Sequence, residues 1–165
     1  MRRAGLRRLA LTFLALSFAA PASAQSPGWR YSPLPGEGDR ASMGCDREAS
    51  ADAFTCIAVR CEVDYGTGVH VHSTREGGDA GAWEITVDRE TRILAAEPSD
   101  APYGARFFED GEWLLDRIRH GGFAIMRHVE DEDAPFAFID LTGSFYAINA
   151  ALAYCAPRLP AEAAG

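Results

Sequence analysis

FTCIAVRC, residues 54–61, is the stretch from which the fold is best inferred. Aromatic and β-branched residues dominate it, which predicts a β-strand. Cys56 and Cys61 are five positions apart and therefore point to opposite faces of that strand. Because a bond between them would break the strand, we expect each cysteine to find its partner elsewhere in the chain.

The other two cysteines supply those partners. Cys61 shares the apolar face of the strand with Ile57, and Cys155 ends a predicted C-terminal helix on its apolar side. We therefore expect a long-range Cys61–Cys155 disulfide, which leaves Cys45–Cys56 as a local one. The sequence contains no CxxC pair, so structural bonds are favoured over reactive thiols.

Residues 1–24 have the pattern of a secretory signal peptide. Four arginines precede the apolar run Leu9–Ala20, and Ala22-Ser23-Ala24 supplies the small residues of a cleavage site. Twelve apolar residues are too few to cross a bilayer core of about 30 Å. We expect export to the periplasm or the cell exterior, no membrane span after cleavage, and the oxidising conditions in which disulfides form.

The charge balance of the mature chain excludes some partners. Of 16 basic residues, all Arg, four leave with the signal, so 12 remain against 24 acidic residues, a net charge of −12. Nucleic acids and anionic membrane surfaces bind positively charged proteins, so they are disfavoured as partners of this acidic chain.

The rest of the chain is predicted to form one domain. Residues 25–40 are rich in Pro and Gly and are expected to be an irregular lead-in anchored by Trp29 and Tyr31. Residues 41–157 are expected to form the domain, and residues 158–165 a flexible tail.

Alternation of apolar and polar residues predicts several further strands. These are residues 69–72, 83–87 and 91–96, followed by a hairpin of 123–129 and 135–140 around the acidic turn 130–133. Residues 98–105 contain two prolines and a glycine and are predicted to be a surface loop.

Two segments have helical spacing. Residues 110–120 carry the stripe Leu114, Leu115 and Ile118, with Asp110 as the expected N-cap and Gly121 as a left-handed end. The final helix is expected to bury one face and to begin at a cap formed by Thr142 or Ser144. That face comprises Phe145, Ile148, Leu152 and Cys155. The predicted class is α+β: antiparallel strands, as a sheet or a sandwich, with two packed helices and disulfide cross-links.

His70 and His72 form the clearest candidate metal site. Imidazoles at i and i+2 project from one face of a strand, and His128 or a neighbouring carboxylate can supply a third ligand. The alternative is ordinary surface alternation on a strand whose valines face inward. The acidic run Glu130–Asp133 lacks the central Gly and ligand spacing of a calcium loop and is predicted to be a solvated turn.

The segment FAFIDLTGSFYAINAALAYC, residues 136–155, has a strand, the turn LTGS, and a helix with a late cysteine. This order resembles the C-terminal end of small secreted proteobacterial proteins of the invasion-associated locus B type, and it is also similar to a type VI secretion accessory family. The resemblance implies that the late cysteine bonds an early strand cysteine. It also implies a non-enzymatic protein of the bacterial envelope.

Three functions follow from these observations. The first is a non-catalytic periplasmic or secreted binding or accessory protein, with an envelope protein as partner and no cofactor. The second is a metal-dependent hydrolase that uses a divalent ion at His70 and His72. The third is a secreted enzyme inhibitor that presents a loop such as Pro98–Ala105.

Overall fold

The computed structural model describes residues 28–31, 40–153 and 155. The predicted signal peptide, most of the lead-in and the predicted tail lie outside these residues. No helix among the described residues is long and apolar enough to cross a membrane.

Within the described part of the chain, nine antiparallel strands form one continuous sheet, in the order β1-β2-β3-β4-β7-β6-β5-β8-β9. The predicted α+β class with two helices is confirmed. The strands are β1 (Gly28–Tyr31), β2 (Ser42–Cys45), β3 (Thr55–Cys61), β4 (Thr67–Ser73), β5 (Gly81–Val87), β6 (Glu90–Pro98), β7 (Ala105–Phe107), β8 (Phe123–His128) and β9 (Ala137–Asp140); the helices are α1 (Gly111–His120) and α2 (Ser144–Leu152).

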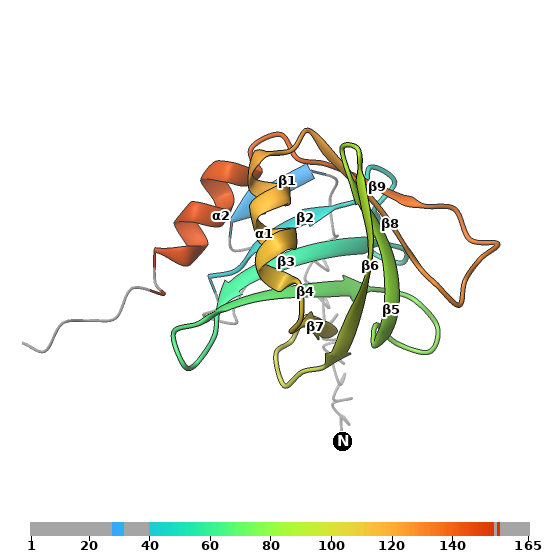
Figure 1. Ribbon diagram of the computed structural model, residues 1–165, viewed down its shortest axis with the longest axis horizontal. Coiled ribbons are helices and arrows are strands. Elements are labelled where there is room, and N and C mark those ends of the chain that lie inside the picture. The colour runs from blue at the N-terminus through green and yellow to red at the C-terminus, as the bar shows by residue number, and fades with distance from the viewer. Residues whose placement is uncertain (1–27, 32–39, 154, 156–165) are drawn as a thin grey trace, which may run out of the picture.

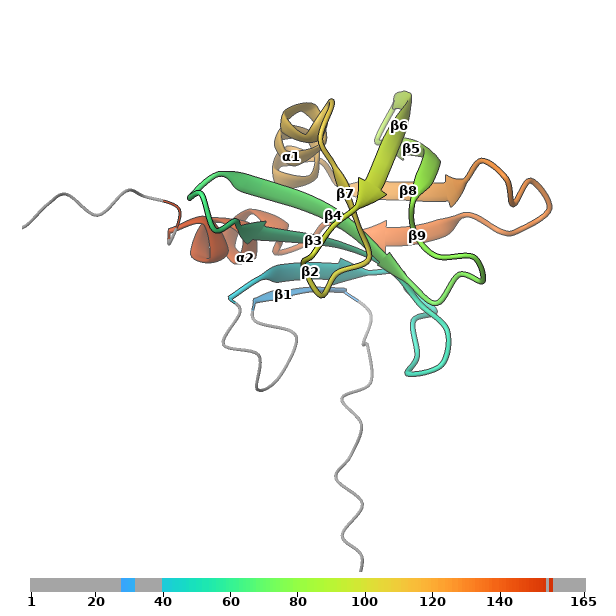
Figure 2. The same cartoon turned by 90° about the horizontal axis from the view of Figure 1, so that it is seen from below.

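The sheet bends until its two ends meet. In Figure 1, β1–β4 run across the view while β5, β6 and β8 run steeply beside them, and Figure 2 shows the same two groups from below. The ends are joined by a bridge between Asp46 and Ile139 and by the Arg47 N–H, which donates to the Phe138 carbonyl at 2.8 Å. Strand twist accumulated over nine strands makes such closure attainable.

The inner face of the bent sheet holds the main core. Ile85 and Met126 come from the sheet, Leu114 and Ile118 from α1, and Ile148 from α2. The α2 helix packs on β1, β2 and β3 and against α1, while α1 packs on β4. The two helices therefore cover the core where the sheet does not.

A second apolar cluster lies on the outer face of β2 and β3, so these strands are buried on both sides. Tyr103, from the connection between β6 and β7, is fully buried there. The cluster comprises Ala41, Met43, Cys45, Cys56, Ala58 and Tyr103. Residues 99–104 form an exposed connection as predicted, but Tyr103 is buried and anchors it to the sheet.

Both predicted disulfides are present. Cys45–Cys56 joins cross-strand neighbours of β2 and β3 with Cα atoms 4.0 Å apart, and Cys61–Cys155 joins β3 to the segment after α2 with Cα atoms 5.1 Å apart. Cys155 lies beyond the helix end at Leu152 rather than within the helix.

The helix ends differ from those predicted. Asp110 precedes α1 in a left-handed conformation and makes no cap hydrogen bond; its carboxylate accepts from Arg92 instead. Gly121 is extended rather than left-handed. Gly143, with φ of 85°, precedes α2 in place of the expected Thr142 or Ser144 cap.

The buried face of α2 is turned relative to the prediction. Ser144, Ile148 and Ala151 are buried, whereas Phe145 is 41% exposed and Leu152 is half-buried. Phe145 instead lies beside α1, with its ring centroid 5.8 Å from that of His120 and 5.6 Å from the Arg119 guanidinium carbon.

Candidate functional site

The three predicted histidines do not come together. His70 and His72 share the outer face of β4, opposite Ala58 and Cys56, whereas His128 lies opposite Trp83 in the inner layer. The described residues contain no group of three or more His, Cys, Asp or Glu side chains arranged to hold a metal ion.

His70 is a buried structural histidine rather than an exposed one. Its side chain is fully buried, and its Nε2 lies 2.7 Å from the Glu62 carboxylate. Because an ionised carboxylate only accepts, the proton is assigned to Nε2, and Nδ1 is buried with no hydrogen-bond partner among the described residues. Burial lowers the pKa of His70 below its ordinary value, although the bond to Glu62 acts in the opposite direction.

Three connections gather at one end of the molecule. They are β2–β3, β4–β5 and β8–β9, which lie together at the right of both Figure 1 and Figure 2. Between them is an open groove of about 820 Å³, which we call the loop-end groove. It is lined by residues 46–48, 53–55, 74–76, 131 and 134–138.

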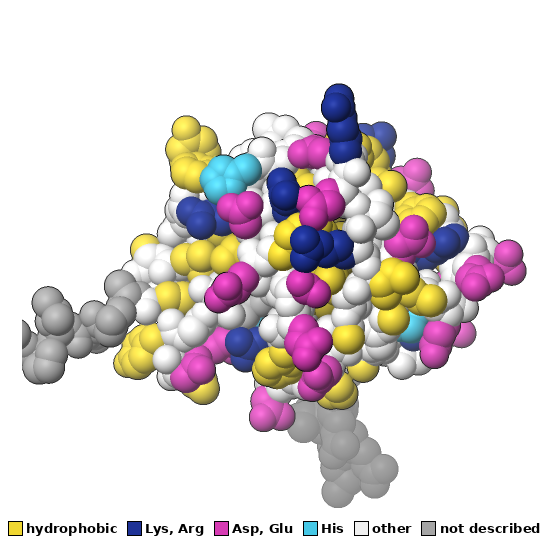
Figure 3. Space-filling model, viewed as in Figure 1, with side chains coloured by type: hydrophobic (Ala, Val, Ile, Leu, Met, Phe, Trp, Pro, Cys, Tyr) yellow, Lys and Arg dark blue, Asp and Glu magenta, His cyan; other side chains and the backbone are white. Residues whose placement is uncertain are grey.

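The rim of the groove is acidic. Glu48 and Glu76 are exposed on its lining, and Glu132 and Asp133 are exposed on the adjoining β8–β9 connection. Figure 3 shows acidic side chains projecting at the right-hand end of the molecule, where that connection lies. Exposed carboxylates therefore outnumber the one exposed guanidinium group of the described lining, that of Arg47.

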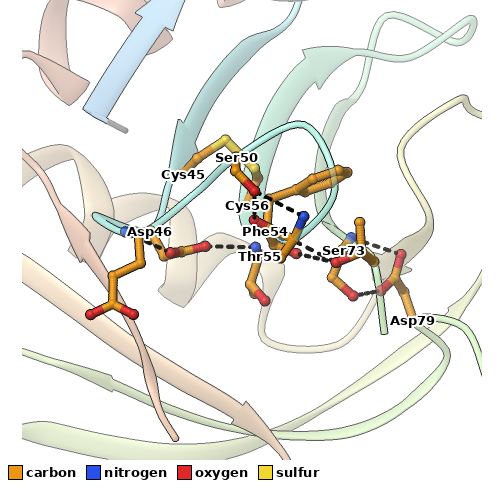
Figure 4. Close-up of a disulfide and its surroundings, with 11 residues drawn as sticks. Cys45, Asp46, Ser50, Phe54, Thr55, Cys56, Ser73 and Asp79 are labelled. Atoms are coloured by element: carbon orange, nitrogen blue, oxygen red, sulfur yellow. Dashed lines mark hydrogen bonds between the residues drawn. A yellow bond between two sulfur atoms is a disulfide. The ribbon is translucent and has the colours of Figure 1, made fainter. Parts of the chain in front are cut away.

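One wall is the β2–β3 connection, closed at its base by the Cys45–Cys56 disulfide (Figure 4). The Asp46 carboxylate accepts from the N–H groups of Glu48 at 2.9 Å and Thr55 at 2.7 Å, bonding to both ends of the connection. Its tip is further held by the Ser50 N–H, which donates to the Ala53 carbonyl. This wall is thus fixed by covalent and hydrogen bonds.

Arg75 joins the second and third connections. Its Nε donates to Asp131 at 2.6 Å, its Nη2 donates to Asp131 and to Glu130, and its Nη1 donates to the Gly78 carbonyl at 2.9 Å. The bond to Asp131 raises the pKa of Arg75, and the same bond lowers the pKa of Asp131. The acidic run is the exposed turn that the sequence predicts, and Arg75 adds ion pairs to two of its four acids, of which Asp131 is the less exposed.

The floor of the groove is aromatic. Phe138 is half-buried on β9, stacked on Phe123 with ring centroids 5.4 Å apart, and the Arg47 guanidinium lies 3.6 Å from the Phe138 ring centre. Phe136 is 39% exposed, with Arg127 over its ring at 4.3 Å. Such cation–π pairs hold both the rings and the guanidinium groups in place.

Sequence reasoning did not find this groove. Its parts come from three connections separated by 19 residues or more, and no spacing rule links Arg75 with Asp131. The local disulfide and the acidic run were recognised separately, and each marks one of its walls. Comparison of the chain with protein-family models, curated proteins and solved structures finds no match.

Proposed function

We propose that this chain is a non-catalytic periplasmic or secreted binding protein that holds a segment of another envelope protein in the loop-end groove. The observation that supports this most strongly is the Arg75–Asp131 pair, because it fixes two walls of the groove before any ligand arrives. A site whose walls are already ordered loses less entropy on binding.

Other observations agree with a binding role. The groove combines an apolar aromatic floor with a polar rim, the division seen in protein-recognition surfaces. The two disulfides suit an oxidising compartment outside the cytoplasm. The resemblance of residues 136–155 to secreted envelope proteins stays a prediction and favours the same function.

The two alternative functions gain no specific support. The hydrolase required His70 and His72 to coordinate a metal ion, but His70 is fully buried and hydrogen-bonded to Glu62. The inhibitor requires a loop at Pro98–Ala105 that reaches into an enzyme; Pro98, Asp100, Pro102 and Gly104 are exposed there, but Tyr103 anchors the loop to the sheet.

Photo-crosslinking in exporting cells tests the proposal. A photoreactive amino acid that replaces Ala53, on the groove lining, should give a discrete adduct with an envelope protein. The same photoreactive amino acid in place of Glu112, which is exposed on α1, should give none. Adding Ala134→Trp, which fills the groove from the opposite wall, should abolish the adduct. An adduct that persists in this filled variant would contradict the proposal.

A further inference from the structure

The loop-end groove has unequal numbers of carboxylates and guanidinium groups. Its lining contains four acidic residues and two arginines. Arg75 and Asp131 neutralise one another, and Asp46 is occupied by two backbone N–H groups. The remaining exposed acids, Glu48 and Glu76, make no side-chain ion pair among the described residues and outnumber Arg47.

The aromatic floor already binds cations from this chain. Arg47 lies over Phe138 and Arg127 over Phe136, so guanidinium groups fit these rings. Phe54 also lines the groove, and no guanidinium of the described residues lies over its ring. Phe54 is half-buried, because it packs on the outer apolar cluster and its ring centroid lies 5.0 Å from that of His72. An arriving Arg or Lys side chain can therefore contact the part of Phe54 that stays exposed, beside the carboxylates of the rim.

The shape of the groove favours a polymer over a small molecule. Small ligands are usually enclosed over most of their surface, whereas much of this lining is exposed, including Ala53, Ala134 and Pro135. An open lining of this kind can accommodate a segment of extended chain, which need not be enclosed. The predicted net charge of −12 would also steer a basic partner toward the protein.

We infer that the loop-end groove binds a basic, extended peptide segment of its partner, with Arg or Lys side chains between the acidic rim and the aromatic floor. This inference rests on the proposed function and names the class of ligand. Such a ligand is complementary to Glu48 and Glu76 at the rim and to the exposed part of Phe54 on the β2–β3 wall.

Fluorescence anisotropy with two labelled peptides tests the sign of the ligand charge. The probes are acetyl-Gly-Lys-Phe-Gly-Arg-Phe-Gly-amide and the same peptide with both cations replaced by Glu. We expect the basic peptide to bind, with an affinity that falls as salt is raised, and the acidic peptide to bind at least about tenfold more weakly. Equal or tighter binding of the acidic peptide would overturn the inference.

A matched pair of double variants separates local from overall charge. Glu48→Lys with Glu76→Lys changes the rim, while Glu97→Lys with Glu112→Lys makes the same change in net charge at exposed positions away from the groove. The rim variant should weaken binding of the basic peptide by about tenfold or more, and the control by less than about twofold. Equal losses in the two variants would overturn the inference.

The groove-filling variant distinguishes this inference from the proposed function. If Ala134→Trp abolishes the cellular adduct while the rim variant retains it, the groove binds its partner but the basic class of ligand is wrong. If the rim variant loses the cellular adduct and the control variant keeps it, the proposed function and the basic class of ligand are both supported.

Discussion

At the scale of single residues, His70 is a strand residue that becomes a buried structural side chain, because both faces of the sheet are covered at its position. Its i, i+2 spacing with His72 is that of a metal-binding pair, yet Glu62 occupies Nε2. Gly68 makes this contact possible, because a Cβ atom there would overlap the Glu62 carboxylate. The His70–Glu62 pair stabilises the contact between the turn of the β3–β4 hairpin and the apolar cluster on the outer face of β2 and β3.

His70 gives the molecule a pH dependence of defined sign. The pKa is lower in the folded chain than in the unfolded chain, where it is about 6.5, so below that pH the unfolded chain binds a proton that the folded chain does not. The melting temperature should therefore fall as the pH is lowered from about 6.5 through the folded pKa. The slope should be shallower in His70→Gln, measured by calorimetry from pH 8 to pH 5. The same slope in both proteins would rule His70 out as its source.

Gly68→Ala should destabilise the fold by about 1–3 kcal/mol, because the new methyl group displaces the Glu62 carboxylate from His70. Gly111→Ala is the matched control: its Cβ would meet nothing within 4 Å, and Ala favours the helix that starts there. Urea denaturation should show a lower midpoint for the first variant alone. A midpoint for Gly68→Ala that matched the control would contradict the packing described here.

At the scale of elements, periodicity located the regular structure but not its exact burial. The alternation in 83–87 matches β5, where Trp83, Ile85 and Val87 are buried. The strands β1, β2 and β7 have four residues or fewer, too few to establish a period, and were missed. The buried face of α2 differs from the predicted one by about one residue, because the spacing of apolar residues in a short helix defines its buried face only that closely.

The burial of α2 predicts which of its residues support the fold. Ile148→Ala should lower stability by about 2–5 kcal/mol, because Ile148 is fully buried in the main core. Tyr146→Ala should change it by less than about 0.5 kcal/mol, since that side chain is 80% exposed. Chemical denaturation of the two variants measures the difference, and similar losses would mean that the helix is rotated from the orientation described.

At the scale of the whole molecule, two disulfides act over different distances. Cys61–Cys155 spans 94 positions and Cys45–Cys56 spans 11. Loop-closure entropy assigns about 4–5 kcal/mol to the first and about 3 kcal/mol to the second. Cysteine pairing was predictable because strand faces are fixed by a period of two. The groove was not, because its walls meet only after the sheet has bent.

The double variants Cys61→Ser/Cys155→Ser and Cys45→Ser/Cys56→Ser separate these contributions. The first should lose more stability than the second in urea denaturation. The second should weaken peptide binding more, because its bond closes a wall of the loop-end groove. The opposite order in both measurements would contradict the roles assigned to the two bonds.

The central claim is that the loop-end groove binds the partner. Its most direct test is NMR titration of the uniformly ¹⁵N-labelled protein with the basic peptide. We predict the largest shift changes at the amides of Thr55, Thr74–Glu76 and Ala137–Phe138 and at the Arg75 Nε–H, with none on α1. Shift changes centred on the helices or the β3–β4 hairpin, with an unchanged Arg75 Nε–H signal, would contradict it.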